Sequence, residues 1–276
     1  MSNKEIPVFF TVDDGYVPFL SVALSSMINN SDIENNYKAI VIHQELSDEN
    51  KKRLRSLAKE HFKVEFAPMK DSLEEITDRM SNRIRCDYFT LTIYFRLFIA
   101  KMFPMYDKGI YIDSDVVVNS DIAELFKVDI GENLLGGCSD LSVANVPVFT
   151  EYMEKAVGVK SEEYINSGVL LLNMKALREE EFDAHFLRLL TTYHFDSIAP
   201  DQDYINAICN GRIFYLDATW NRMSANPGIL FLRKSTILPI CLRSDASALK
   251  TSAGFSGSMR FSCVAFTIRS VLVPVA

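Results

Sequence analysis

The chain has 276 residues, of which 48% are hydrophobic and 24% are charged, a composition typical of a folded globular protein. Its formal net charge of −7 excludes a general binder of nucleic-acid phosphates, which would need a clustered excess of Lys and Arg. Five cysteines without a C-x-x-C pair indicate neither a disulfide framework nor a zinc site. The first residues lack the basic and apolar segments of a signal peptide, so the expected location is the cytoplasm.

The first part of the chain alternates between strand-like and helix-like segments. Apolar runs rich in Val, Ile and Phe predict strands at residues 6–12, 39–42 and 64–66. Helices are predicted between them at residues 17–29 and 47–60, the second with acidic residues in its first turn, where the helix dipole favours them. This alternation predicts an α/β fold with parallel strands, right-handed crossovers and ligands bound beyond the carboxyl ends of the strands.

The middle of the chain adds further strands and helices without an internal repeat or a linker. In chain order we expect a helix at residues 91–103, strands at 109–112 and 134–138, a helix near 152–157, a strand at 169–173 and a helix at 177–193. We therefore interpret residues 1–223 as one domain.

Residues 224–276 differ in composition from the rest of the chain. They carry a net charge of +5, from six Lys and Arg residues against the single acidic residue Asp245, and they contain no Tyr, Trp or His. We interpret them as an atypical basic, Ser-rich tail that is either divergent or encoded in a shifted reading frame. Such a tail also allows peripheral contact with anionic lipid at the inner face of a membrane.

Two acidic residues follow the strand predicted at residues 109–112. In Asp113-Ser114-Asp115, residues i and i+2 of an extended segment point to the same side, so both carboxylates can face one point in the crevice. Two such charges repel each other unless a cation lies between them. A divalent ion with oxygen ligands, Mn²⁺ or Mg²⁺, meets this requirement and keeps positions open for a diphosphate. The sequence therefore predicts a metal site at Asp113 and Asp115.

Two common phosphate-binding motifs do not occur in the chain. It has neither a G-x-x-x-x-G-K-[ST] loop nor a G-x-G-x-x-G segment after the first strand, which disfavours a kinase and a dehydrogenase. A metal-dependent nucleotidyltransferase is an alternative, because that class also uses paired aspartates in an α/β sheet. It does not account for the segments around Asn166 and Asp201.

Six segments, taken in chain order, form a recognisable pattern. They are Phe10-Thr11-Val12-Asp13-Asp14-Gly15-Tyr16, Leu91-Thr92-Ile93-Tyr94-Phe95-Arg96-Leu97, Tyr111-Ile112-Asp113-Ser114-Asp115-Val116-Val117, Gly137-Cys138-Ser139-Asp140, Asn166-Ser167-Gly168-Val169-Leu170-Leu171-Leu172-Asn173 and Asp201-Gln202-Asp203. Together they resemble glycosyltransferase family 8, which includes bacterial lipopolysaccharide galactosyl- and glucosyltransferases and glycogenin. The resemblance covers residues 6–223.

The resemblance implies a glycosyltransferase A-type fold, which is a Rossmann-like nucleotide-binding mixed sheet flanked by helices. It also implies a family 8 catalytic domain over residues 1–223, Mn²⁺ or Mg²⁺ as cofactor, and transfer with retention of the anomeric configuration. The implied donor is a UDP-hexose, either UDP-glucose or UDP-galactose. The implied acceptor is a saccharide or glycolipid, such as lipopolysaccharide or a cell-surface glycan.

The resemblance also assigns residues to the nucleotide end of the donor site. Asp13 would bond the edge of the uracil, and Tyr16 would stack on its ring. Asp113 would contact both the ribose and the metal, while Asp115 would ligate the metal directly. Ser114, between these two aspartates, belongs to the same donor-binding segment.

A second set of residues is assigned to the sugar end. Arg96 would bind the diphosphate or the sugar, and Asp140 would lie toward the acceptor. Asn166, Asp201 and Gln202 would surround the donor sugar. Asp201 and Gln202 are the candidates to stabilise an oxocarbenium-like sugar, by either a double displacement or a same-face attack.

The chain departs from the family pattern after Met223. Family members commonly complete the metal site with a His from a later His-x-x-Gly-x-x-Lys-Pro-Trp-like segment, whose Lys reaches the diphosphate. Here no His follows His194, and Trp220 is the only Trp. The alternative function is therefore a nucleotide-sugar-binding protein with little or no turnover.

Overall fold

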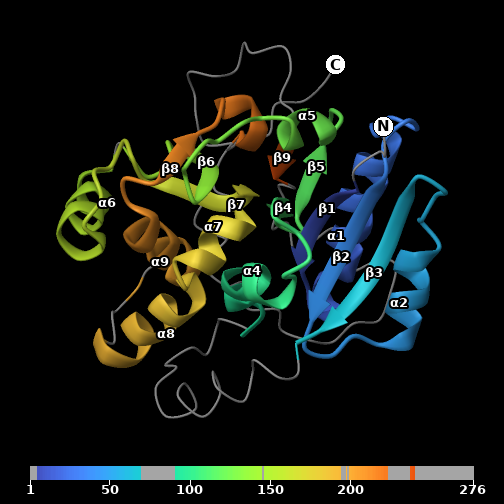
Figure 1. Ribbon diagram of the computed structural model, residues 1–276, viewed down its shortest axis with the longest axis horizontal. Coiled ribbons are helices and arrows are strands. Elements are labelled where there is room, and N and C mark those ends of the chain that lie inside the picture. The colour runs from blue at the N-terminus through green and yellow to red at the C-terminus, as the bar shows by residue number, and fades with distance from the viewer. Residues whose placement is uncertain are drawn as a thin grey trace, which may run out of the picture.

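A seven-stranded mixed sheet in the order β3-β2-β1-β4-β7-β6-β8 forms the centre of the computed structural model (Figure 1). The structure describes residues 5–69, 91–144, 146–193, 197, 199–222 and 237–239. The strands of this sheet are β1 (Ile6–Thr11), β2 (Tyr37–His43), β3 (Phe62–Pro68), β4 (Gly109–Ile112), β6 (Leu135–Ser139), β7 (Ile165–Leu172) and β8 (Ile213–Tyr215). A second, two-stranded sheet pairs β5 (Val116–Val118) with β9 (Ile237–Pro239).

The first half of the large sheet is parallel, as the sequence predicts. β1 pairs with both β2 and β4, and β2 pairs with β3. Helices α1 (Val17–Asn29) and α2 (Asp48–Arg55) connect these strands. The prediction that α2 continues to residue 60 is wrong, because Lys59 and Phe62 exchange two backbone hydrogen bonds of 2.9 and 3.1 Å in a tight turn that leads into β3.

The second half of the sheet contains antiparallel pairs. β7 is antiparallel to both β4 and β6, so the end of β4 lies beside the start of β7. The strand predicted at residues 169–173 in fact begins at Ile165 and ends at Leu172. Asn206 explains the earlier start, because its side-chain amide forms two hydrogen bonds of 2.8 Å with the backbone N–H and carbonyl of Ile165.

Helices cover both faces of the large sheet. The remaining helical segments are η1 (Asp14–Tyr16), η2 (Leu91–Phe98), α4 (Ile99–Met102), α5 (Ala123–Phe126), α6 (Pro147–Tyr152), η3 (Met153–Val157), α7 (Met174–Glu179), α8 (Phe182–Tyr193), α9 (Pro200–Cys209) and η4 (Ala218–Asn221). The predicted helix at residues 91–103 is divided into the 3-10 helix η2 and α4. The predicted helix at residues 177–193 is also wrong as one element, because Glu181 has a φ of 48° and separates α7 from α8.

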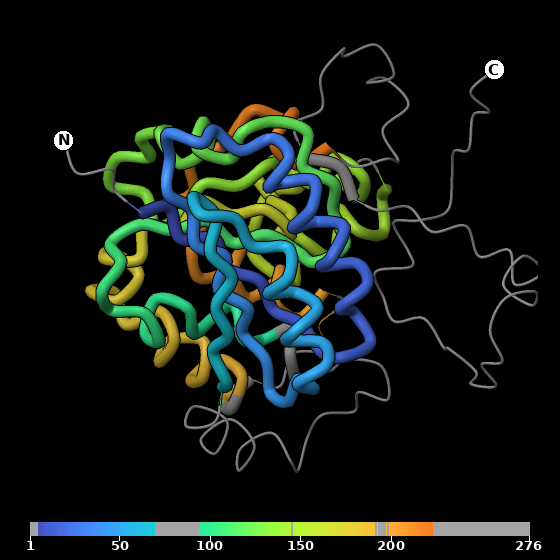
Figure 2. Tube along the Cα trace, turned by 90° about the vertical axis from the view of Figure 1, so that its right-hand side faces the viewer, coloured from blue at the N-terminus to red at the C-terminus, as the bar shows by residue number. Residues whose placement is uncertain are grey.

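The core consists of two large apolar clusters, one on each face of the sheet. Alternate residues of β1 separate them, since Val8 and Phe10 belong to one cluster and Phe9 to the other. α1, α2 and α5 pack on the first cluster, whereas η2, α4, α7, α8 and α9 pack on the second. Figure 2 shows α1 in blue and α8 in gold on opposite sides of the molecule.

The predicted tail is described only in part. Within residues 224–276 the structure describes residues 237–239, which form β9 and pair antiparallel with β5. The rest of the predicted tail lies outside the described residues. In the part of the chain that the structure describes, no helix is both long and apolar enough to cross a membrane.

Candidate active site

Asp113 and Asp115 follow β4 at its carboxyl end, where the sequence places them. The N–H of Asp113 donates to the carbonyl of Gly168 at 2.8 Å. This bond joins residues 113–115, here called the aspartate segment, to β7. Burial, followed by the negative charge of Asp113, raises the pKa of Asp115 to about 6. The two carboxylates therefore repel each other in a partly buried position, as expected for a site that accepts a cation.

Asp115 gives the protein a specific pH dependence of stability. Because its folded-state pKa of about 6 lies above the ordinary value of 3.8, the folded chain binds an extra proton between these values and loses stability as the pH rises through them. We expect Asp115→Asn to stabilise the metal-free protein more at about pH 7.5 than at about pH 4.5. Urea unfolding of both proteins measures this difference, and a difference independent of pH would contradict it.

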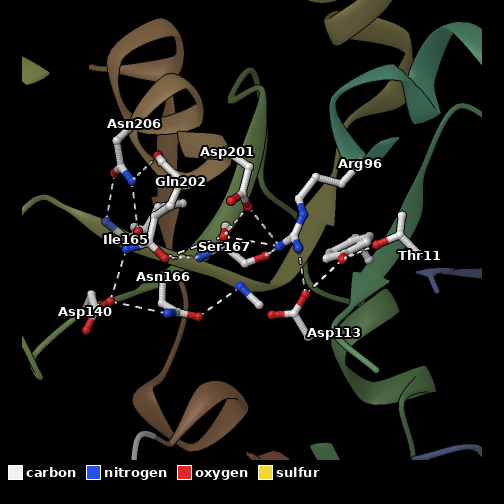
Figure 3. Close-up of polar contacts among 12 residues, drawn as sticks. Thr11, Arg96, Asp113, Asp140, Ile165, Asn166, Ser167, Asp201, Gln202 and Asn206 are labelled. Carbon is white, nitrogen blue, oxygen red and sulfur yellow. Dashed lines mark hydrogen bonds and ion pairs between the residues drawn. The ribbon is translucent and has the colours of Figure 1, made fainter. Parts of the chain in front are cut away.

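Arg96 links the aspartate segment to helix α9. Its guanidinium forms ion pairs with Asp113 Oδ1 at 3.0 Å and with Asp201 Oδ2 at 3.1 Å, and its side chain is only 8% exposed (Figure 3). Burial lowers the pKa of Arg96, but Asp113 and Asp201 more than offset this, so the pKa lies above its ordinary value. Arg96 therefore stays charged and holds two carboxylates, while its predicted contact with the donor stays a prediction.

Asp201 and Ser167 complete this ion-pair network. The Ser167 hydroxyl donates to Asp201 Oδ2 at 2.9 Å, and Arg96 Nη1 donates to both the hydroxyl and the carbonyl of Ser167, at 3.2 and 3.1 Å. Burial raises the pKa of Asp201, and the positive charge of Arg96 opposes this rise. Sequence reasoning missed the role of Ser167, although the segment Asn166-Ser167-Gly168 contained the signal.

The other predicted sugar-end residues meet beside this network. Gln202 Nε2 and Asn166 Nδ2 both donate to Asp140 Oδ2, at 3.1 and 3.3 Å, while Gln202 Oε1 accepts from the N–H of Ser167 at 3.0 Å. Asp140 is buried and also accepts hydrogen bonds from Ser142. Figure 3 shows these side chains close together with Asp201, Arg96 and Asp113, as parts of one branched network of polar contacts. The structure thus brings together residues of η2, β7 and α9 with the residues that directly follow β4 and β6, although they are far apart in the sequence.

Asp203, next to this network, has a separate structural role. Its carboxylate accepts hydrogen bonds from the hydroxyls of Tyr152 and Tyr164, both at 2.6 Å, and of Ser197 at 2.5 Å. It also accepts from the N–H of Ala199 at 3.1 Å, just before α9 begins. Asp203 therefore anchors the first turn of the helix that carries Asp201 and Gln202.

Asp13 and Tyr16 lie at the end of β1, where the nucleobase is expected. Asp13 Oδ1 accepts from the N–H of Tyr16 at 3.0 Å and so begins η1, and the Tyr16 side chain is 41% exposed. Burial, and then the charges of Asp115, Asp13 and Asp113, raise the pKa of Tyr16. The buried Ser114 hydroxyl donates to the carbonyl of Thr11 at 3.0 Å, which joins the ends of β4 and β1.

Gly168 leaves space for the Asp113 carboxylate. A Cβ atom at this position would lie 2.8 Å from Asp113 Oδ2 and 2.9 Å from Asn166 Oδ1. We expect Gly168→Ala to displace Asp113 and to weaken metal-dependent nucleotide binding about tenfold. Calorimetry measures this, with Gly136→Ala as the control because a Cβ there would lie 3.3 Å from atoms of the Leu216 side chain. Equal nucleotide binding by both variants would contradict the expectation.

Carboxylate oxygens from Asp113 and Asp115 fit a hard divalent cation by their chemistry. Across the described residues, however, no group of three or more His, Cys, Asp or Glu side chains gathers to hold a metal ion. Among the residues that the structure describes, the two aspartates therefore provide only part of a coordination shell.

A model of a protein family matches the part of the chain that contains the six sequence segments. The chain belongs to glycosyltransferase family 8, whose model matches residues 7–228. The resemblance found in the six sequence segments is therefore confirmed.

Two bacterial relatives show how far this similarity extends. The chain is 30% identical over 220 residues to a Haemophilus influenzae protein that carries a glycosyltransferase name, covering 79% of this chain and 64% of the relative. It is 26% identical over 228 residues to the lipopolysaccharide 1,2-glucosyltransferase of Escherichia coli, covering 80% of this chain and 63% of that enzyme. The chain thus spans just under two thirds of the length of each.

Solved structures confirm the predicted glycosyltransferase A-type fold. The galactosyltransferase LgtC, solved in complex with donor and acceptor sugar analogues, superposes with a TM-score of 0.70 at 20% identity, covering 89% of this chain and 92% of that chain. The bifunctional glycosyltransferase WbbM superposes with a TM-score of 0.70 at 25% identity, covering 87% of this chain and 46% of that chain.

Proposed function

We propose that this chain is a retaining, metal-dependent glycosyltransferase that moves a hexose from a UDP-sugar to a saccharide or glycolipid acceptor. The observation that carries the proposal is the continuous polar network from Asp113 through Arg96, Asp201 and Ser167 to Gln202, Asp140 and Asn166. Its members come from η2, β7 and α9 and from the residues that directly follow β4 and β6, and its Asp113 end follows β4, the strand that pairs with β1. Membership of glycosyltransferase family 8 supports the reaction class.

The nucleotide end of the proposed site would be formed by β1 and the aspartate segment. Asp13 would accept from the uracil N–H, and the exposed ring of Tyr16 would stack on the base. Asp113 and Asp115 would hold Mn²⁺ or Mg²⁺, which when bound would neutralise charge on the diphosphate leaving group. Cation binding would also relieve the repulsion that raises the pKa of Asp115.

The sugar end would be formed by α9 and β7. Departure of the diphosphate leaves positive charge on the sugar ring, which the Asp201 carboxylate would stabilise. The ion pair with Arg96 opposes the rise in the pKa of Asp201 that burial causes. Gln202 and Asn166 would bond sugar hydroxyls, and Asp140 would hold the acceptor side, because hydrogen bonds already align all three side chains.

Titration of UDP into the protein by calorimetry, with and without MnCl₂, tests the proposal. UDP release from UDP-glucose and from UDP-galactose is followed in the same samples, and the two donors are compared at equal concentration. We expect binding that depends on the metal and turnover with one of the two donors. Absence of UDP binding in the presence of both Mn²⁺ and Mg²⁺ would contradict the proposed function.

A nucleotide-sugar-binding protein with little or no turnover is the second candidate. It is favoured by the presence of only two clustered carboxylates in the described part of the site and by the missing His and Lys of the family pattern. Metal-dependent UDP binding without release of UDP from either sugar donor, in the presence of saccharide acceptors, would support this candidate over the enzyme.

We further propose that the protein acts in the cytoplasm and contacts the inner face of the membrane through residues 224–276. The support is the net charge of +5 in this segment of an otherwise acidic chain. Sedimentation of the full chain with vesicles tests this contact. Binding to vesicles that contain phosphatidylglycerol, and not to pure phosphatidylcholine, is expected, and binding to neither would contradict it.

A further inference from the structure

Within the described part of the chain, hydrogen bonds and ion pairs reach only one oxygen of the Asp113 carboxylate. Its Oδ1 atom accepts from the Tyr111 hydroxyl at 2.8 Å and from Arg96 Nη2 at 3.0 Å. Its Oδ2 atom lies toward Gly168, at the position where a Cβ atom would come within 2.8 Å. The two donors therefore restrict the rotation of the carboxylate through Oδ1 and leave Oδ2 as the oxygen that can face a ligand.

Tyr111 lies beneath both groups that it supports. Its side chain belongs to β4, is 1% exposed, and lies with its ring under the Arg96 guanidinium, whose central carbon is 4.4 Å from the ring centroid. The hydroxyl also contacts Thr11 Oγ1 at 3.0 Å. Because the Tyr111 hydroxyl donates to Asp113, the Thr11 hydroxyl is the donor in this second bond. A buried chain of hydroxyls thus runs from the last residue of β1 to Asp113.

Such a chain affects how a carboxylate binds a cation. The terminal torsion of an aspartate side chain has a broad energy minimum, so an unsupported carboxylate samples many orientations. Two hydrogen bonds to one oxygen restrict this rotation before the ligand arrives, and outer hydrogen bonds to metal ligands typically contribute about 10–100-fold to metal affinity.

We propose that the Thr11–Tyr111 hydroxyl pair positions Asp113 to offer a single oxygen, Oδ2, to the divalent cation of the donor site. This inference rests on the proposed function. It makes Tyr111 a positioning residue that acts through Asp113. The ring and the hydroxyl of Tyr111 have different partners, Arg96 and Asp113, so that substitution can separate their effects.

Tyr111→Phe tests the inference because it removes the hydroxyl and keeps the ring under Arg96. Mn²⁺ binding is measured without nucleotide, by the electron paramagnetic resonance signal of the free ion, and again with UDP. We expect the Mn²⁺ dissociation constant to rise about tenfold. Thr11→Val, which removes only the first hydroxyl of the chain, should raise it less.

Tyr37→Phe is the matched control. Tyr37 is also buried in a strand of the large sheet, and its hydroxyl donates to Asp121 Oδ1 at 2.6 Å, away from the aspartate segment. This variant should lose thermal stability without a change in Mn²⁺ affinity. A general structural effect of losing a buried hydroxyl is thereby separated from an effect on Asp113.

The outcomes distinguish this inference from the proposed function. If the original chain binds Mn²⁺ and UDP, but Tyr111→Phe and Thr11→Val bind Mn²⁺ as tightly as the original, the inference alone is overturned. If the original chain binds neither Mn²⁺ nor UDP, the proposed function fails and the inference fails with it. If Tyr111→Phe does not fold, the Mn²⁺ dissociation constants of Thr11→Val and Tyr37→Phe are compared. A higher constant for Thr11→Val alone supports the inference, and equal constants overturn it.

Discussion

Asp115→Asn should abolish the effect of Mn²⁺ on UDP binding and lower the rate of UDP-sugar turnover by at least about 10²–10³-fold. The asparagine removes the charge that would attract the cation, whereas the side-chain volume is nearly unchanged. Because burial and Asp113 already hold the pKa of Asp115 at about 6, the variant should be at least as stable as the original chain near neutral pH. Loss of function would then not reflect unfolding.

Asp107→Asn is the control for this experiment. Asp107 precedes β4, at the end opposite to Asp113, and forms an ion pair with Arg178 at 3.2 Å while its side chain is 70% exposed. The loss of this charge should leave stability nearly unchanged, because exposed ion pairs contribute little to it. Turnover and Mn²⁺ dependence should also stay unchanged, because Asp107 lies at the other end of β4. If Asp115→Asn retained Mn²⁺-dependent UDP binding, the assignment of Asp115 as a metal ligand would be wrong.

Arg96→Met should cause the largest loss of stability, about 3–5 kcal/mol of the free energy of unfolding, together with loss of turnover. The methionine fills part of the space of the arginine stem but leaves the buried Asp201 carboxylate without its ion-pair partner. Urea unfolding at neutral pH measures the change. Arg212→Met removes a side chain that is 40% exposed, with an ion pair of 3.3 Å to Glu180 and two hydrogen bonds to the Glu132 carbonyl, and should cost less than Arg96→Met.

The double variant Arg96→Met/Asp201→Asn separates the structural from the catalytic part of this effect. Removing the second charge should recover part of the lost stability, because a neutral amide then replaces the buried, unpaired carboxylate. It should recover no turnover, since Asp201 is proposed to face the donor sugar. If the double variant were no more stable than Arg96→Met, the ion pair with Asp201 would not explain the role of Arg96.

Local sequence patterns were sufficient for the parallel half of the fold. The strands near residues 6–12 and 39–42 and the helix at residues 17–29 are apolar runs with clear periods, and the structure confirms them. The start of β7 was not predictable in this way, because it depends on the amide of Asn206, which lies 41 residues away in the sequence. The break at Glu181 was missed because nothing in its neighbourhood marks a positive φ.

The candidate site was predictable as a set of positions but not as a set of contacts. The order of the motifs identified Asp113, Asp140, Asn166 and Asp201, and the structure brings them together. Which atoms face one another was not accessible, because Arg96 holds two carboxylates that are 88 residues apart in the chain. For the same reason the role of Tyr111 could not be read from its strand alone.

The segment between β6 and β7 comprises residues 140–164. Its two ends are joined by a hydrogen bond of 2.8 Å from the N–H of Asp140 to the carbonyl of Tyr164. It contains α6 and η3 and has its own small apolar cluster, built on Met153, Val159 and Tyr164. An insertion or deletion within β7 would instead shift the register of the strand. A shift by one residue would turn Ser167 and Gly168 to the opposite faces of the sheet. Over evolution, insertions and deletions should therefore accumulate in this segment, which begins at Asp140, rather than in β7.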